Sequence, residues 1–119
     1  AGLALEGAIY HPLGELLERF DALVCPTFAV PALPADWEPG APVGGQLAQP
    51  ENWLDVMMTL PFNIASRCPV MSVPSGQSRD GVPTGLSIVG RTYDDPTVFR
   101  IAAAHEARMP GWDTNRPSL

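Results

Sequence analysis

Two short apolar runs separated by a turn dominate the hydrophobic pattern of this 119-residue chain. The first run is 70–73, closed by Pro74, and the second is 85–89, closed by Gly90. Both are rich in β-branched residues, both have the length of a strand, and Asp80-Gly81 between them is a turn signal. The pattern predicts a β-hairpin with a loose tip. Because neither run alternates between apolar and polar residues, we expect its strands to be covered on both faces.

Helical periodicity appears in three further segments. In the first, Leu13, Leu16, Leu17 and Phe20 form one apolar stripe, which predicts a helix over 12–20 with Pro12 at its first position. The preceding ten residues carry two glycines and are expected to be ragged or weakly helical. A strand over 22–25, stopped by Pro26, should follow the helix.

The other two periodic segments lie on either side of the hairpin. A short helix is predicted over 51–60, stopped by Pro61, and a longer one over 95–109, with Asp95 as its N-cap and Pro96 at its first position. The expected fold class is α/β: a mixed sheet, part of a larger fold, covered by the helices 12–20 and 95–109. Five apolar residues should lie in adjacent strands of that sheet: Val24, Met71, Val73, Leu86 and Ile88.

Composition bounds the organisation of the chain. A length of 119 residues allows one domain, 1–119, and the 14 prolines indicate that much of the chain is loop or strand edge. Prolines and glycines concentrate in 31–50, which we expect to be a long mobile loop, and 112–119 should be a frayed tail. The formal net charge of −6 argues against a nucleic-acid partner. No apolar run reaches the roughly 20 residues of a membrane span, and no signal peptide is evident, so we expect a cytoplasmic protein without membrane contact.

Few residues could carry chemistry on their own. Ser87 lacks the second glycine of a G-x-S-x-G nucleophile elbow, so it is expected to be an ordinary strand serine. Cys68 lies beside Arg67, which could lower the pKa of its thiol, and His11 or His105 could act as a base, but no third group is visible. Cys25 sits in an apolar strand, where thiols are usually inert. The cysteines and histidines lack the spacing of a metal site. We therefore expect no catalytic residue, no metal and no cofactor in this chain.

Four pieces of the sequence together resemble the C-terminal part of amidase signature hydrolases. They are Asn63; the run 68–90, with Cys-Pro-Val-Met-Ser-Val-Pro-Ser-Gly and Asp-Gly-Val-Pro-Thr-Gly-Leu-Ser-Ile-Val-Gly; the strand Phe-Asp-Ala-Leu-Val-Cys-Pro-Thr over 20–27; and a last helix after Asp95. The resemblance extends from about Glu15 to about Glu106. It departs from the family pattern at Ser87, where Gln is usual, and in a gap after Asn63 that is one residue longer.

The resemblance implies an activity whose machinery is outside this chain. Members of the family cleave amides with a Ser nucleophile, a second Ser and a Lys base in an upstream Gly- and Ser-rich segment. All seven basic residues here are arginines, which cannot accept a proton. The chain then resembles a detached C-terminal portion of an amidase whose partner is the missing N-terminal portion. Asn63, Phe62 and Thr27 are the residues expected to contact substrate.

Two other interpretations remain open at this stage. The chain could be a free-standing, non-catalytic binding or assembly module with the same fold, or, less simply, a Cys-dependent enzyme that uses Cys68. An isolated C-terminal piece should also expose apolar surface and strand edges, so we expect the isolated chain to form a homo-oligomer, most simply a twofold dimer.

Overall fold

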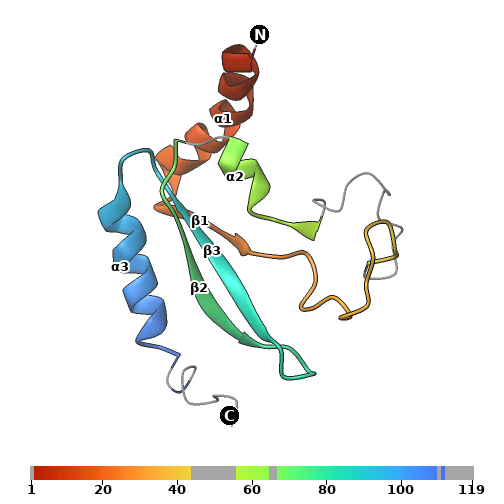
Figure 1. Ribbon diagram of the computed structural model, residues 1–119. Coiled ribbons are helices and arrows are strands. Elements are labelled where there is room, and N and C mark those ends of the chain that lie inside the picture. The colour runs from red at the N-terminus through yellow and green to blue at the C-terminus, as the bar shows by residue number, and fades with distance from the viewer. Residues whose placement is uncertain (1, 44–55, 65–66, 110, 112–119) are drawn as a thin grey trace.

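The computed structural model describes residues 2–43, 56–64, 67–109 and 111. Its elements follow the order α1 (Gly2–Arg19), β1 (Ala22–Pro26), α2 (Leu60–Ile64), β2 (Val70–Gln77), β3 (Pro83–Gly90) and α3 (Asp95–Glu106). The described strands form one antiparallel sheet in the order β1-β3-β2, and α3 packs along β2 and β3 (Figure 1). The α/β class and the predicted hairpin are confirmed.

The core lies between α3 and the sheet. Ile88 of β3 pairs with Val24 of β1 and with Met71 of β2, so these three side chains share one face. Ile88 packs against Val98 and Ala102 of α3 in the buried cluster. The five residues predicted to share a sheet do so: Val24, Met71, Val73, Leu86 and Ile88.

Gly90 sets how closely α3 approaches the sheet. A Cβ atom at this position would lie 2.3 Å from Cγ2 of Val98, so a side chain there would displace the helix. The backbone N–H of Gly90 also donates to the carbonyl of Pro69 at 2.9 Å, which fixes the start of β2 beside the end of β3. The glycine that closes the second apolar run is therefore a packing requirement.

The expectation that both hairpin strands are covered on both faces is right for one strand only. β3 is the central strand, and its residues 87–90 are buried. β2 is an edge strand, and its side chains alternate between exposed and half-buried from Val70 to Pro74. The apolar residues of β2 on the α3 face are covered, whereas Val70 and Ser72 on the other face are exposed.

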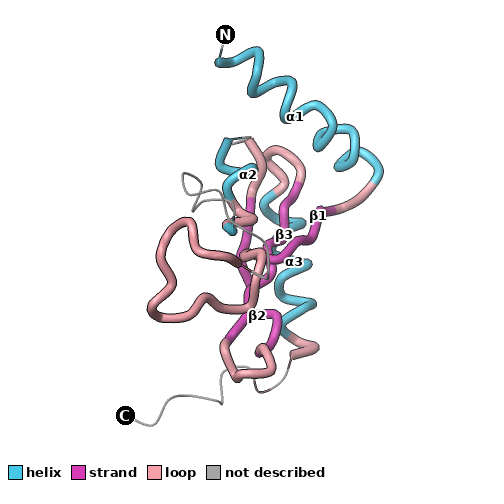
Figure 2. The backbone as a smooth tube through the Cα atoms, turned by 90° about the vertical axis from the view of Figure 1, so that its right-hand side faces the viewer, coloured by secondary structure: helices cyan, strands magenta, loops and turns pink. Residues whose placement is uncertain are grey.

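Helix α1 differs most from its prediction. It begins at Gly2 and continues through Pro12, which was expected to start it. It projects beyond the end of the sheet instead of packing across a face (Figures 1 and 2). Side-chain contacts to distant segments hold its first half: Tyr10 hydroxyl to Thr92 hydroxyl at 2.7 Å, and Arg67 Nε donating to Glu6 Oε1 at 3.0 Å.

The bounds of the other helices also differ. Of the predicted helix 51–60, residues 51–55 lie outside the described residues. Met57 forms an isolated antiparallel β-bridge to Phe28 instead of a helical turn. Pro61 lies in the first turn of α2 instead of ending a helix. Asp94, not Asp95, caps α3: its Oδ1 accepts from Thr97 N–H at 3.4 Å. The helix ends at Glu106, three residues before the predicted end.

Most of the predicted loop can be followed. Residues 31–43 form turns, with Trp37 N–H donating to the Pro34 carbonyl at 3.0 Å and Ala41 N–H to the Glu38 carbonyl at 2.9 Å. The rest of the predicted loop, 44–50, and the predicted tail, 112–119, lie outside the described residues. Among the helices that the structure describes, none is long and apolar enough to cross a membrane.

Candidate functional site

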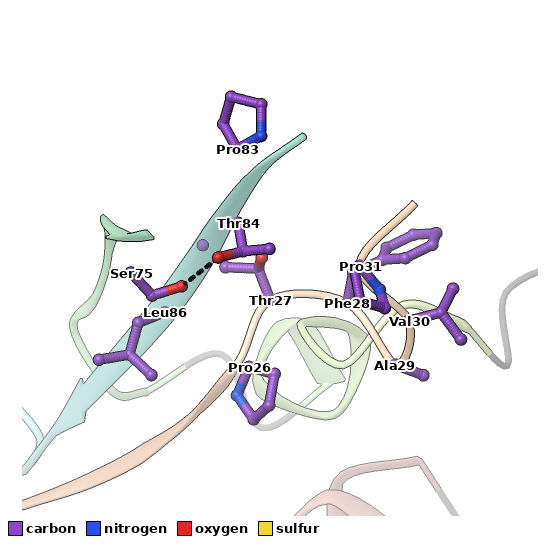
Figure 3. Close-up of a pocket in the computed structure, with 11 residues that line it drawn as sticks. Pro26, Thr27, Phe28, Ala29, Val30, Pro31, Ser75, Pro83, Thr84 and Leu86 are labelled. Atoms are coloured by element: carbon purple, nitrogen blue, oxygen red, sulfur yellow. Dashed lines mark hydrogen bonds between the residues drawn. The ribbon is translucent and has the colours of Figure 1, made fainter. Parts of the chain in front are cut away.

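A pocket of about 330 Å³ opens where β1 ends and β3 begins (Figure 3). One wall is the segment 26–31 that leaves β1, and the other is the start of β3, 83–86, with Ser75 of β2. The lining is mostly proline, aliphatic and aromatic carbon, and three hydroxyl groups interrupt it, from Thr27, Ser75 and Thr84. Thr27, predicted to contact substrate, therefore lies in the wall of a pocket.

Backbone hydrogen bonds fix Thr27 in place. Its N–H donates to the Gly85 carbonyl at 3.1 Å, and its own carbonyl accepts from Met58 N–H at 3.2 Å. Gly85 leaves room for the threonine side chain, since a Cβ at that glycine would lie 2.7 Å from Thr27 Oγ1. The pairing continues beyond Thr27, where Ala29 N–H donates to the Val56 carbonyl at 2.8 Å.

The other two predicted substrate residues, Phe62 and Asn63, lie on α2. This helix follows directly after the segment that pairs with Thr27 and Phe28, so the pocket wall and α2 are connected through the backbone. Phe62 is half-buried and Asn63 is exposed. Neither is among the described residues that line the pocket. The structure thus brings Thr27 to the pocket and places Phe62 and Asn63 on an adjoining element.

Sequence reasoning missed the second side of the pocket. Ser75 Oγ and Thr84 Oγ1 are 2.8 Å apart and form a hydrogen bond across β2 and β3 (Figure 3). The strand register shifts between Pro74 and Gly76, which is a β-bulge, and bulges reorient side chains locally. His105 of α3 contacts this point through Nε2, 2.8 Å from the Pro74 carbonyl oxygen. The repeated Pro-hydroxyl-Gly triplets, 74–76 and 83–85, were the available signal.

The structure does not support a cysteine nucleophile. Burial raises the pKa of the Cys68 thiol above its usual value, although a hydrogen bond with Thr92 partly offsets this, and burial likewise raises the pKa of Cys25. Arg67, which could have lowered the pKa of Cys68, instead forms an ion pair with Glu6. Thiols with raised pKa values remain largely protonated at neutral pH and are poor nucleophiles.

Among the described residues, Ser87 and the acidic and imidazole side chains do not form another candidate catalytic or metal site. Ser87 is fully buried in the central strand, which keeps substrate away from it, and its hydroxyl has no hydrogen-bond partner among the described residues. Within the described ranges, no three His, Cys, Asp or Glu side chains gather into a group that could hold a metal ion.

Sequence comparisons relate this chain to known proteins. The sequence matches the family model described as amidase over residues 3–99. It is 34% identical over 99 residues to a glutamyl-tRNA(Gln) amidotransferase subunit of Lactococcus lactis, and the match covers 83% of this chain and 18% of that protein. It is 30% identical over 119 residues to a fatty acid amide hydrolase of Medicago truncatula, covering 98% of this chain and 19% of the relative.

Two crystal structures share the fold. The corresponding glutamyl-tRNA(Gln) amidotransferase subunit of Thermotoga maritima superposes with a TM-score of 0.70 at 32% identity, over 90% of this chain and 22% of that one. A structure described as an amidase superposes with a TM-score of 0.75 at 26% identity, over 90% of this chain and 24% of that one. The chain spans about a fifth of the length of the curated relatives that it matches. With a family match over most of its residues and the same fold in both structures, this chain belongs to the amidase family.

Proposed function

We propose that this chain is the C-terminal portion of an amidase that hydrolyses the C–N bond of a carboxamide through a Ser-Ser-Lys triad outside these 119 residues. The observation that carries the proposal is the family match over 3–99 in a chain that contains no lysine. The coverage of about a fifth of each relative supports the view that the remaining machinery belongs to a longer protein.

The chemistry explains why a lysine base is needed elsewhere. The nucleophilic Ser attacks the amide carbonyl carbon, its proton passes to a base, and the amine leaves with a proton as an acyl-enzyme ester forms. Water then hydrolyses the ester and regenerates the Ser. A neutral Lys can accept and return the proton, whereas the guanidinium groups of this chain stay charged and cannot. Burial and neighbouring groups can lower the pKa of a lysine enough for this role.

The described residues would supply one wall of the substrate pocket. Thr27 lines the pocket beside Ser75 and Thr84, and the same backbone pairing that fixes Thr27 leads into α2. On this proposal Asn63 and Phe62 extend the wall from α2 toward the part of the substrate that lies nearer the upstream triad. Because the pocket is open in the described chain, the remaining portion of the protein would close it.

Activity of the complete reading frame tests the proposal. The full-length product should release ammonia or amine from simple carboxamides, and replacing the upstream lysine by alanine should abolish turnover. The isolated 119-residue chain should show no hydrolysis above background. Turnover by the isolated chain that persists in the Cys68→Ala, Ser87→Ala double variant would contradict the proposal. A reading frame with no upstream Gly- and Ser-rich segment and no upstream lysine would favour the non-catalytic module.

A further inference from the structure

The bulge in β2 removes Ser75 from the regular pairing of the strands. Pro74 pairs with Gly85. Gly76 pairs with Thr84, so the register passes over Ser75, which is the extra residue of the bulge. Pro74 has no N–H to donate, and Gly76 has a φ of 128°, which residues with a side chain rarely adopt. The position of Ser75 therefore depends on contacts outside the ladder between β2 and β3.

Helix α3 supplies such a contact through His105. Its Nε2 lies 2.8 Å from the carbonyl oxygen of Pro74. A carbonyl oxygen can only accept a hydrogen bond, so the imidazole carries a proton on Nε2 and donates it. The bond ties the backbone immediately before Ser75 to α3.

His105 is itself placed by the packing of α3. It follows Val98 and Ala102 at the spacing i, i+4 and i+7, so it lies on the helix face that packs on the sheet. Its backbone carbonyl accepts from Arg108 N–H at 3.0 Å, which continues the helical turn. Because Val98 and Ala102 pack against Ile88, the bond from His105 joins an irregular segment of β2 to the core.

The residue that this bond holds is part of the pocket wall. Ser75 Oγ and Thr84 Oγ1 are 2.8 Å apart, and both residues line the pocket beside Thr27 (Figure 3). A shift of the peptide between Pro74 and Ser75 would move the serine hydroxyl relative to Thr84. His105 is not among the described residues that line the pocket, so it can act on a ligand there only through Ser75.

We propose that His105 is a positioning residue of this site. Its bond to the Pro74 carbonyl sets where Ser75 lies in the pocket wall, and thereby how tightly the pocket holds substrate. The inference rests on the proposed amidase function and concerns the same pocket. The proposed nucleophile and base lie outside these residues, so the contribution of His105 should appear in substrate binding, as a lower KM, and not in kcat.

Ammonia release by the full-length protein from acetamide and benzamide tests the proposal. His105→Phe keeps an aromatic ring but removes the donor, and should raise KM by about 2- to 10-fold, the value of one hydrogen bond. Its kcat should stay within about twofold of the wild type. His105→Gln can donate from its side-chain amide and should restore KM. His11→Phe, the same substitution at a histidine whose side chain is 75% exposed on α1, is the matched control and should change neither constant.

A double variant shows whether His105 acts through Ser75. Ser75→Ala should raise KM, and adding His105→Phe should raise it no further, because effects that share one route are not additive. Amide hydrogen exchange of residues 75–77 should be faster in His105→Phe than in the wild type, with 86–89 unchanged as the reference. A thermal melt checks the fold of each variant, and His105→Leu, which also lacks the donor, replaces His105→Phe if that variant does not fold.

The outcomes separate this inference from the proposed function. Ammonia release with equal KM in the wild type and His105→Phe overturns the positioning role and leaves the amidase function standing. A rise in KM that His105→Gln does not reverse, strict additivity with Ser75→Ala, or unchanged exchange at 75–77 overturns it as well. Faster exchange at 75–77 in His105→Phe, with no ammonia release from either carboxamide by the wild-type protein, supports the bond to the bulge and refutes the proposed function.

Discussion

The two long helices of this chain have opposite relations to the core. Helix α3 buries Val98 and Ala102, 2% and 7% exposed, against Ile88 of the central strand. Helix α1 buries Leu17 but leaves Leu3 79% and Leu5 65% exposed, with Ile9 and Leu16 also exposed. Both helices have apolar stripes, yet only α3 has its stripe covered within the described chain. The contrast shows that the sheet and α3 form a local core, whereas α1 leaves apolar surface exposed among the described residues.

The sheet shows the same contrast on a smaller scale. Its central strand is covered, but Val24 and Val70 on the two outer strands remain nearly half-exposed. Exposed apolar residues on edge strands are a liability unless another element covers them. A chain that spans about a fifth of its relatives would leave both features uncovered, because the elements that pack there would lie in the remaining four-fifths.

The largest expected difference between the two regions comes from shortening one apolar side chain in each. Ile88→Ala should lower the free energy of unfolding by about 2–5 kcal/mol, because Ile88 is 1% exposed and the substitution leaves a cavity. Leu3→Ala should change it by no more than about 0.5 kcal/mol, because Leu3 already faces solvent. Chemical denaturation of the isolated chain measures both. A large loss for Leu3→Ala would mean that α1 is packed within the chain.

Adding a methyl group should lower stability at the sheet, at Gly90, and raise it in α1, at Gly7. Gly90→Ala should cost about 1–3 kcal/mol, because the new Cβ would lie 2.3 Å from Val98 Cγ2, and Val98→Ala should partly rescue it. Gly7→Ala in α1 meets nothing within 4 Å and should stabilise the chain by up to about 1 kcal/mol through helix propensity. The double variant is the control: strictly additive losses at positions 90 and 98 would show that the two side chains do not collide.

The smallest effect on stability, but a clear effect on association, is expected from the exposed apolar residues in the first half of α1. We predict that the isolated chain self-associates and that the Leu3→Ser, Leu5→Ser, Ile9→Ser variant shifts it toward monomer. Ala4→Ser with Ala8→Ser, on the same helix, is the matched control and should leave association unchanged. Sedimentation over a concentration series measures the shift. A wild-type chain that stays monomeric at high micromolar concentration would refute the prediction and favour a self-sufficient module.

Local sequence signals predicted the centre of the fold well. The hairpin, a strand beginning at residue 22 and α3 were all expected, because β-branched runs, the Asp80-Gly81 turn and Pro96 act over a few residues. The strand includes Pro26, which was expected to stop it. The capping residue was misplaced by one position because Asp94 and Asp95 are adjacent carboxylates, and only the bond to Thr97 distinguishes them. Which strand lies at the centre of the sheet was not predictable from these signals.

Long-range contacts account for the features of the fold and the pocket that the sequence did not predict. The start of α1 was missed because Pro12 is a favourable first residue of a helix. In the structure the helix begins before Pro12 and is held by contacts of Tyr10 with Thr92 and of Glu6 with Arg67. The same holds at the pocket. Thr27 was expected there from the family resemblance, but the Ser75–Thr84 pair depends on a strand register and a bulge that no local pattern specifies.

Hydrogen exchange on α1 tests most directly whether this chain is one part of a longer amidase. The amides of residues 4–12 would be measured in the isolated chain and in the full-length product, with those of β3 as the internal reference. We predict that exchange in α1 slows strongly in the full-length product, because the remaining portion covers the exposed apolar residues Leu3, Leu5 and Ile9, while exchange in β3 changes little. Equal α1 exchange in both proteins would contradict it.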